Sequence, residues 1–428
     1  MLAIPVIDGP VPWILLALSA VILVCLVARR WSGRQVIGTV IAALAGAAIA
    51  ASAVLVADET DAFGMRLPTF VLFTSIAAFA AVGVAVASLW APGWWRKILA
   101  VLGVVVFAAT GAILVNAQFG INPTLGSIFG IEPDENTPLP HTDGTAAPAP
   151  KQPLYETWTP PPGMPATGTI GSRVIPATIS GFDARPAGIY LPPAALVDNP
   201  PALPVILFMM GQPGNPDASY IGKALDEYAA KNRGLAPIAV VADQVGTADV
   251  DTACADSKAY GNAMTYITKD VVSWMKANLH IIDDARYWAI GGYSNGGSCA
   301  ITLAAKHPDM WKNVMDVSGE PFPGSEEIDA VIADVYNGDQ AAFEASKPVA
   351  ILAAHPGEYS GMTAAFTAGG GDPAYMAAAE MVSAAAREAG MTVSYDVIPG
   401  AGHVGDAVTV GMQITVGKMF PALGLTAP

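Results

Sequence analysis

Residues 286–300 read RYWAIGGYSNGGSCA, and this stretch decides the fold. It begins with a strand-like run that ends at Ile290, and it closes with small residues typical of a closely packed helix start. Between them, Gly292 to Gly296 match the pattern G-x-S-x-G, whose glycines leave room where a Cβ would clash with the adjoining strand and helix. The pattern alone is a weak signal, but its strand-turn-helix context is the required one. The stretch predicts that Ser294 is the nucleophile of a serine hydrolase or acyltransferase.

Strand-like and helical segments alternate on both sides of this turn. Buried-strand patterns and amphipathic patterns follow each other along the chain, and such repetition predicts a mostly parallel sheet with helices on both faces. An antiparallel pair is expected to open the domain. The expected strands are 172–179, 187–191, 205–210, 238–241, 287–290, 313–317, 349–353 and 392–398, and the expected helices are 217–231, 262–278, 297–306 and 373–389.

The N-terminal part has a different composition from the rest. The whole chain is 53% hydrophobic and only 13% charged, which is too apolar for an ordinary soluble domain of 428 residues. Four runs without a charged residue, 11–28, 36–57, 68–90 and 98–117, are long enough to cross most or all of a bilayer core of about 30 Å. No basic segment precedes the first run, so a cleaved signal peptide is disfavoured. We expect four transmembrane helices within residues 1–118.

Charges in the short loops predict the orientation of these helices. Basic residues follow the first and third runs, whereas the loop after the second run is mostly acidic, and basic loops stay in the cytoplasm. The N-terminus and everything after the fourth run are therefore expected outside. The small-residue ladder Ala42, Gly46 and Ala50 predicts helix packing, and no ionisable side chain lies at membrane depth as a transporter would need. The loop charges are Arg29, Arg30, Arg34, Asp58, Glu59, Asp61, Arg66, Arg96 and Lys97.

The exported part is expected to consist of a linker and one domain. Residues 119–131 alternate apolar residues with Gly, Asn and Pro and are expected at the membrane surface, and prolines recur up to residue 167, which completes a linker and tether over 119–167. A domain over 168–428 remains. Residues 1–131 carry six basic and four acidic side chains, and the remainder carries 15 and 32, a net charge of −17. Such acidity argues against nucleic acid as a partner.

A serine hydroxyl needs a base, and an acid must orient that base. His403 follows the last expected strand in the glycine-rich loop 399–403, so we expect it to be the base in preference to the other four histidines. The acid should follow the strand before the last, and Glu358 lies in the loop after 349–353. Asp372 is the alternative, because the glycines of 369–371 could bring it inward. The other histidines are His141, His280, His307 and His355.

Two backbone N-H groups should stabilise the oxyanion that forms during acyl transfer. Asn295, directly after the nucleophile, is expected to supply the first. The loop Met210 to Gly214 follows the first parallel strand, and Gln212 is expected to supply the second. This chemistry requires no metal and no cofactor.

Two of the three cysteines fall in the exported part, where oxidation is possible. Cys299 lies at the start of the helix after the nucleophile, and Cys254 lies after the strand 238–241, which we expect to run beside the nucleophile strand. A disulfide between them is expected, with two buried thiols as the alternative. Cys25 lies within the first apolar run.

From about 168 to 410 the chain resembles the esterase D-like branch of the α/β-hydrolases, which contains feruloyl esterases and the secreted mycolyltransferases of actinobacteria. The resemblance rests on the segments 179–182, 189–193, 292–297 and 400–403, and it is strongest to membrane-tethered actinobacterial members. It implies an α/β-hydrolase domain with Ser294, Glu358 and His403 as the triad. One departure is Gly405, where such esterases often carry a tryptophan.

The sequence thus predicts an external serine esterase acting on an ester-linked acyl group, and its anchoring favours a lipid or cell-envelope substrate. An acyltransferase would use the same acyl-Ser294 intermediate with a sugar hydroxyl in place of water, and the sequence does not separate the two. A catalytically inactive membrane scaffold or binding module is the alternative of another class. The complete nucleophile motif and histidine loop argue against it.

Overall fold

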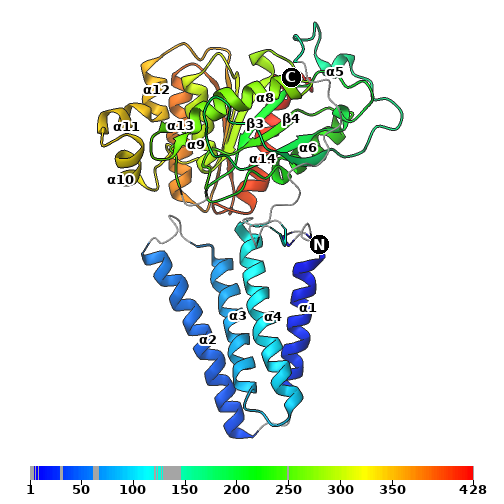
Figure 1. Cartoon of the computed structure of the whole chain (residues 1–428), viewed down its shortest axis with the longest axis vertical. Coiled ribbons are helices and arrows are strands. Elements are labelled where there is room, and N and C mark those ends of the chain that lie inside the picture. Colours follow the sequence, from blue (N-terminus) through cyan, green and yellow to red (C-terminus); the bar gives the residue numbers. More distant parts are fainter. Residues whose placement is uncertain are drawn as a thin grey trace. The chain divides into compact units, whose positions relative to one another are not determined.

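The computed structural model describes residues 4, 6–7, 9–28, 32–60, 67–119, 122, 124–126, 128, 146–247 and 250–427. The chain divides into two compact units, Met1–Pro133 and Asp134–Pro428 (Figure 1). Each unit has its own cluster of buried apolar side chains. The two units are therefore described separately.

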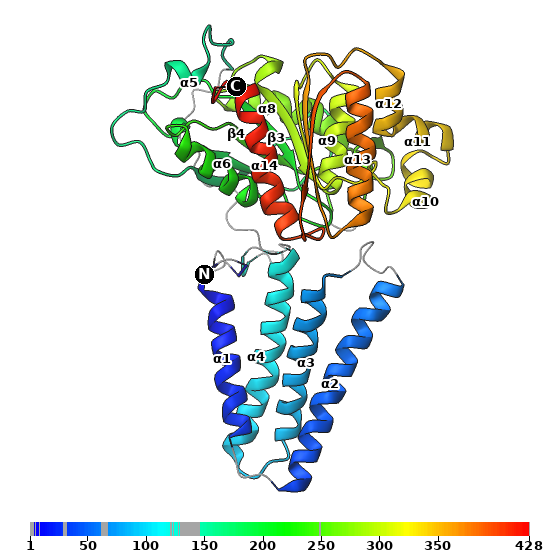
Figure 2. The same ribbon diagram turned by 180° about the vertical axis from the view of Figure 1, so that it is seen from behind.

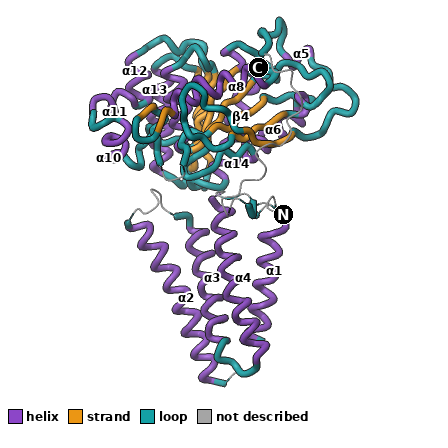
Figure 3. Tube along the Cα trace, viewed as in Figure 1, coloured by secondary structure: helices purple, strands orange, loops and turns teal. Residues whose placement is uncertain are grey.

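Four helices make up most of the first unit, and each is long and apolar enough to cross a membrane. Their outward faces carry exposed large apolar side chains such as Trp13, Ile14 and Phe73. Lipid tails would cover such faces without the free-energy cost that water imposes. The prediction of four apolar helices is confirmed. They are α1 (Pro10–Val27), α2 (Gly33–Glu59), α3 (Thr69–Ser88) and α4 (Trp94–Phe119), which Figure 3 distinguishes from the strands by colour.

Small residues hold α2 and α3 close together. A Cβ at Gly46 would overlap the carbonyl of Phe79, and one at Gly83 would overlap the carbonyl of Ala42. Backbones can approach this closely only where side chains are absent. The expected role of the ladder around Gly46 in helix packing is confirmed.

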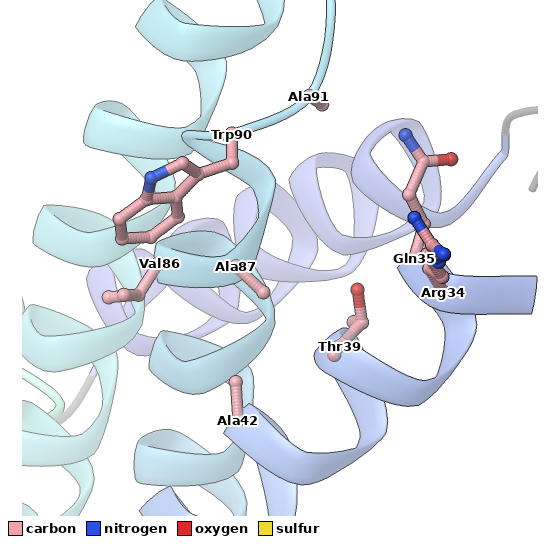
Figure 4. Close-up of a pocket in the computed structure, with 9 residues that line it drawn as sticks. Arg34, Gln35, Thr39, Ala42, Val86, Ala87, Trp90 and Ala91 are labelled. Atoms are coloured by element: carbon pink, nitrogen blue, oxygen red, sulfur yellow. The ribbon is translucent and has the colours of Figure 1, made fainter. Parts of the chain in front are cut away.

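Two cavities lie within the four-helix unit. One, of about 370 Å³, lies between α2 and α3, with Arg34 and Thr39 on one wall and Trp90 on the other (Figure 4). The other, of about 560 Å³, lies between α3 and α4 and is bordered by Asn116. Neither lining contains a nucleophile paired with a base, so neither cavity is an alternative catalytic site.

An eight-stranded sheet forms the centre of the second unit, in the order β1-β2-β4-β3-β7-β8-β9-β10. β1 and β2 are antiparallel to each other and β2 is antiparallel to β4, while every other pair of neighbours is parallel. The prediction of a mostly parallel sheet is confirmed. Its strands are β1 (Thr169–Arg173), β2 (Ala187–Leu191), β3 (Val205–Met209), β4 (Ile238–Ala242), β7 (Trp288–Tyr293), β8 (Asn313–Val317), β9 (Thr363–Gly369) and β10 (Thr392–Ile398), and a separate hairpin joins β5 (Asp256–Ser257) to β6 (Gly261–Asn262).

Helices cover both faces of this sheet. In Figure 1 the helices α8 and α9 lie before the sheet, and in Figure 2, seen from behind, α6 and α14 do. Helix α12 contacts both α9 and α13, and α14 contacts α6, so each face has its own layer. The helices are α5 (Leu154–Thr157), α6 (Ser219–Lys231), α7 (Ala263–Thr265), α8 (Val272–Asn278), α9 (Asn295–Lys306), α10 (Ile328–Ala330), α11 (Gln340–Ser346), α12 (Pro348–Ala354), α13 (Pro373–Glu388) and α14 (Asp406–Ala422).

Two expected strands are wrong. Residues 349–353 belong to the helix α12, because Pro348 occupies its first turn, where proline favours a helix, and the alanine-rich run that follows forms helices readily. The strand before the last is β9, whose alanines and glycine give little β propensity but whose position between β8 and β10 keeps it almost wholly buried. The opening strand ends at Arg173 and does not reach residue 179.

The expected tether is only partly described, because its residues 132–145 lie outside the described part of the chain, as do most residues of 119–131. From residue 146 onwards the chain packs on the second unit. Ala147 pairs with Ile282, Leu154 is buried, and the indole N-H of Trp158 donates to the carbonyl of Arg233 at 2.9 Å. These contacts fix the part of the linker nearest the domain.

Candidate active site

Ser294 lies at the turn between β7 and α9. Its φ of 54° is a conformation that residues other than glycine rarely adopt, and its N-H donates to the carbonyl of Val317 at 3.0 Å. A Cβ at Gly292 would overlap the backbone of Gly296, and one at Gly296 would overlap the carbonyl of Met209. The two glycines of the motif are therefore needed for strand, turn and helix to meet at the serine.

His403 lies directly beside this serine. It is in the loop between β10 and α14, and its Nε2 is 2.9 Å from the Oγ of Ser294. The two residues are only 8% and 6% exposed. Burial lowers the pKa of His403 to about 3, so the imidazole is neutral at physiological pH and can accept the hydroxyl proton. The pair has the geometry of a nucleophile with its general base.

The carboxylate nearest to this imidazole belongs to Asp372. Its Oδ2 is 4.0 Å from the Nδ1 of His403. Asp372 follows β9 and caps α13, with its Oδ1 accepting the N-H of Tyr375 at 3.3 Å. Among the residues that the structure describes, the buried Nδ1 of His403 has no hydrogen-bond partner. Asp372 can therefore stabilise an imidazolium by charge, but it does not hold the ring through a hydrogen bond.

The structure does not bring Glu358 to His403, and the expectation that it would is wrong. Glu358 is exposed and pairs with His355 at 3.4 Å. The N-H of the preceding Gly357 donates to the carbonyl of Ala389, at the end of α13, whereas Asp372 caps the beginning of the same 16-residue helix. A helix of that length extends about 24 Å. Glu358 therefore lies near the amino ends of the parallel strands, whereas Asp372 lies at their carboxyl ends. The error follows from the strand misassigned to 349–353.

The loop after β3 lies against Ser294, as the oxyanion prediction requires. A Cβ at Gly211 would be only 3.0 Å from the Cβ of Ser294. Asn295 is the first residue of α9, where backbone N-H groups have no intrahelical acceptor. The position of the Gln212 N-H relative to an oxyanion stays a prediction. Both expected donors nevertheless belong to segments that meet at the nucleophile.

Gln244 joins these two segments, although no sequence motif marks it. Its buried Nε2 donates to the carbonyl of Met210 at 2.6 Å and to the Oδ1 of Asn295 at 3.0 Å. The Nδ2 of Asn295 in turn donates to the Oδ2 of Asp251 at 3.1 Å. The only signal in the sequence is that Gln244 comes shortly after the end of β4. Ser294 likewise follows the carboxyl end of its strand, β7.

Buried carboxyl groups surround this network. Burial raises the pKa of Asp251 and raises that of Glu320 well above its ordinary value. In both cases a neighbouring carboxylate adds to the effect, and in the case of Glu320 that neighbour is Asp251. Hydrogen bonds, such as the one from the hydroxyl of Ser325 to Glu320 at 3.1 Å, partly offset it. No group of side chains suited to a metal ion occurs among the described residues.

The disulfide between Cys254 and Cys299 is present, with the two Cα atoms 5.7 Å apart. The reason given for it was wrong in one respect, because β3 lies between β4 and β7 and the two strands are not neighbours. The cysteines meet because the loop after β4 and the beginning of α9 both lie at the carboxyl ends of the parallel strands. Cys25 is free and exposed.

The chain resembles known proteins in sequence and in fold. A family model described as "Putative esterase" matches residues 183–409. An uncharacterized protein of Corynebacterium glutamicum is 31% identical over 331 residues, covering 73% of this chain and 72% of that protein. The structure of a ferulic acid esterase matches with a TM-score of 0.50 and 15% identity, over 60% of this chain and 99% of that one. An S-formylglutathione hydrolase from Agrobacterium tumefaciens has a TM-score of 0.49 and 16% identity, over 61% and 97%.

Proposed function

This chain belongs to the esterase family whose model matches residues 183–409, and from that premise we propose that it is a membrane-anchored, extracytoplasmic serine esterase. The observation that carries the proposal is the 2.9 Å contact between the Oγ of Ser294 and the Nε2 of His403 at a strand-to-helix turn. An inactive scaffold would have no need for a buried base beside a strained serine.

In the proposed reaction, Ser294 attacks the carbonyl carbon of an acyl ester while its proton passes to the Nε2 of His403. The N-H of Asn295 and, as we propose, that of Gln212 stabilise the oxyanion. Asp372, in place of Glu358, stabilises the imidazolium that forms. His403 then returns the proton to the departing alkoxide, which leaves as an alcohol, and the acyl-Ser294 ester remains. In the second half, water attacks this ester and gives a carboxylic acid and free enzyme.

Transfer to another hydroxyl is the second candidate, and one observation favours it. Ser294 and His403 are almost wholly covered, so bulk water has little access to the acyl-enzyme. A bound alcohol that excludes water would then compete well for the acyl group. Such an acceptor, for example a sugar hydroxyl, would resolve acyl-Ser294 by the same proton transfers.

Membrane anchoring supports a lipid or envelope ester as the substrate. We propose a transmembrane region over residues 1–118, a linker over 119–167 and an extracytoplasmic catalytic domain over 168–428, with basic loops such as that at Arg96 in the cytoplasm. The four apolar helices support the anchoring. Attachment to the bilayer would raise the effective concentration of the domain towards lipid-linked acyl groups.

A fluorophosphonate probe on the purified full-length protein tests the proposal. It should label the wild type at Ser294 and leave Ser294→Ala unlabelled, because only an activated serine reacts. Ser298→Ala is a matched control, since Ser298 lies one turn further along α9 and its hydroxyl donates to the carbonyl of Asn295 at 2.8 Å. This control should label normally. A wild-type protein that neither labels nor cleaves short p-nitrophenyl esters would refute the enzymatic proposal.

A further inference from the structure

Two tyrosine rings lie close to the imidazole of His403. The ring of Tyr375 is 3.7 Å away between centroids, at an interplanar angle of 31°, and the ring of Tyr293 is 5.3 Å away at 26°. Both tyrosines are only 9% exposed. The hydroxyl of Tyr293 donates to the carbonyl of His403 at 2.9 Å, which fixes the backbone of the histidine loop. Two aromatic rings therefore restrict the space around the imidazole.

Tyr375 is itself held by a carboxylate. Its hydroxyl donates to the Oε1 of Glu326 at 2.7 Å. The same hydroxyl also interacts with the side chain of Ser294. A bond to a charged acceptor is stronger than one between neutral groups, so Glu326 can restrict the rotation of Tyr375 about its side-chain bonds. One tyrosine thereby contacts both members of the nucleophile-base pair.

This contact matters because the usual means of orienting the imidazole is missing here. In a Ser-His-Asp triad the acid holds the ring through a hydrogen bond from Nδ1-H. At 4.0 Å Asp372 is beyond hydrogen-bonding distance, and the described residues provide no other partner for the Nδ1 of His403. Packing must therefore keep Nε2 directed at Ser294.

On the premise of the proposed esterase reaction, we propose that Tyr375 is a positioning residue. Its ring holds the imidazole of His403 in line with Ser294, and its hydrogen bond to Glu326 holds the ring. Tyr375 lies in the first turn of α13, three residues after Asp372. The acid and the positioning ring therefore come from one rigid helix terminus.

The ring also keeps water from His403, and this predicts a change in the pH profile. The ionisable groups around the imidazole are Asp372 and Tyr375 at the start of α13 and Tyr293 at the end of β7, with Glu326 behind Tyr375. Burial is what lowers the pKa of His403, so removing the ring should raise that pKa towards its ordinary value of 6.5. The acidic limb of the activity profile should then move to higher pH. A phenylalanine would preserve the ring and leave the limb in place.

The test compares Tyr375→Phe, Tyr375→Ala, Glu326→Gln and the double variant Tyr375→Phe/Glu326→Gln, all in the full-length protein. The assay is kcat and KM for p-nitrophenyl butyrate between about pH 2.5 and 9, so that it spans an acidic limb set by a pKa of about 3. Tyr395→Phe is the matched control, because its hydroxyl also bonds to α13, at the carbonyl of Met376, without contacting His403. It should behave like the wild type.

We expect Tyr375→Ala to lower kcat by about 100-fold with little change in KM, and to move the acidic limb upwards by about one pH unit or more, because misplacement of a catalytic group by about 1 Å has an effect of this size. Tyr375→Phe and Glu326→Gln should each lower kcat by about 5- to 10-fold. The double variant should be no worse than the poorer single variant, because both substitutions act on the same bond, which phenylalanine removes and glutamine weakens by removing its charge.

A Tyr375→Ala protein with a wild-type kcat and an unmoved acidic limb would overturn the proposal. If Ser294→Ala were inactive in the same assay, the esterase function would still hold. Independent, multiplying effects of Tyr375→Phe and Glu326→Gln would refute the link between them even if the alanine variant failed to fold. Failure of the function itself looks different, because the wild type would then be inert towards both the ester and the fluorophosphonate probe.

Discussion

Replacing Asp372 by asparagine should impair catalysis without unfolding the site. Asparagine caps helices about as well as aspartate, so α13 should keep its N-terminus and the N-H of Tyr375 its acceptor. What disappears is the negative charge 4.0 Å from the Nδ1 of His403. That charge stabilises the imidazolium, which exists only after Ser294 has given up its proton.

The distance sets the size of the expected effect. Two unit charges about 4 Å apart attract by about 4 kcal/mol at an effective dielectric constant of about 20. Asp372 is 21% exposed at its side chain, and the solvent there screens part of this energy, so about 2–3 kcal/mol is a reasonable loss. This corresponds to a fall in kcat/KM of about 30- to 150-fold. In the Ser-His-Asp triad of serine proteases the same change lowers kcat by about 10⁴-fold, because there the acid is hydrogen-bonded to the histidine.

Glu358→Gln is the matched comparison. Its exposed pair with His355 contributes at most about 1 kcal/mol to stability. Glu358 lies near the end of α13 opposite to Asp372, and the length of that helix, about 24 Å, exceeds the screening length of about 8 Å at physiological salt. We expect its kcat/KM for p-nitrophenyl butyrate to stay within about twofold of the wild type. Both variants should melt within a few degrees of the wild type. A larger loss for Glu358→Gln than for Asp372→Asn would refute the reasoning from distance.

Four further predictions concern stability, oxidation, topology and anchoring. Burial raises the pKa of Asp316 to about 7, so its contribution to stability is fully present below about pH 4 and is lost as the pH rises towards 7. Asp316→Asn should therefore gain stability over the wild type by about 1.4 kcal/mol per pH unit across that window in denaturant titrations, and parallel curves would contradict this. The cross-link between Cys254 and Cys299, 45 positions apart, should contribute about 4 kcal/mol to stability, and alkylation without reductant should modify Cys25 alone; labelling of all three cysteines would contradict this. Protease added to intact cells or spheroplasts should cut within residues 132–145, whereas cleavage only in inverted vesicles would reverse the topology. A domain excised from residue 146 onwards should keep its activity on soluble esters and lose it on bilayer-presented acyl lipids, and equal activity of the excised and full-length proteins on vesicles would argue for a soluble substrate.

The parts of the fold that local chemistry specifies could be predicted from the sequence. The turn at Ser294 needs glycines at fixed positions, and the strands β8 and β10 carry β-branched residues, so their limits were found without the structure. Four uninterrupted apolar runs predict four helices that are long and apolar enough to cross a membrane, and the structure has them. In each case the signal lies within one short segment.

The sequence predicts the wrong structure where neighbouring strands and helices, and not the local residues, decide the conformation. The apolar run from Val349 fits a buried strand and a buried helix equally well. The alanine-rich segment β9 is a strand because it pairs with β8 and β10, which the sequence alone does not show. That single error moved the expected acid from Asp372 to Glu358. Gln244 and Tyr375 could not have been found, because their importance comes from contacts between loops far apart in the chain.

The bond between Cys254 and Cys299 also indicates the redox conditions that the domain has met. It joins a loop and a helix that meet only after β3, β4 and β7 have assembled, so it forms in a folded domain and not in a nascent chain. It also needs an oxidising compartment. Protein made in a reducing cytosol would lack the bond although the same core could form. The oxidation state of purified material therefore reports whether the folded domain has reached an oxidising compartment.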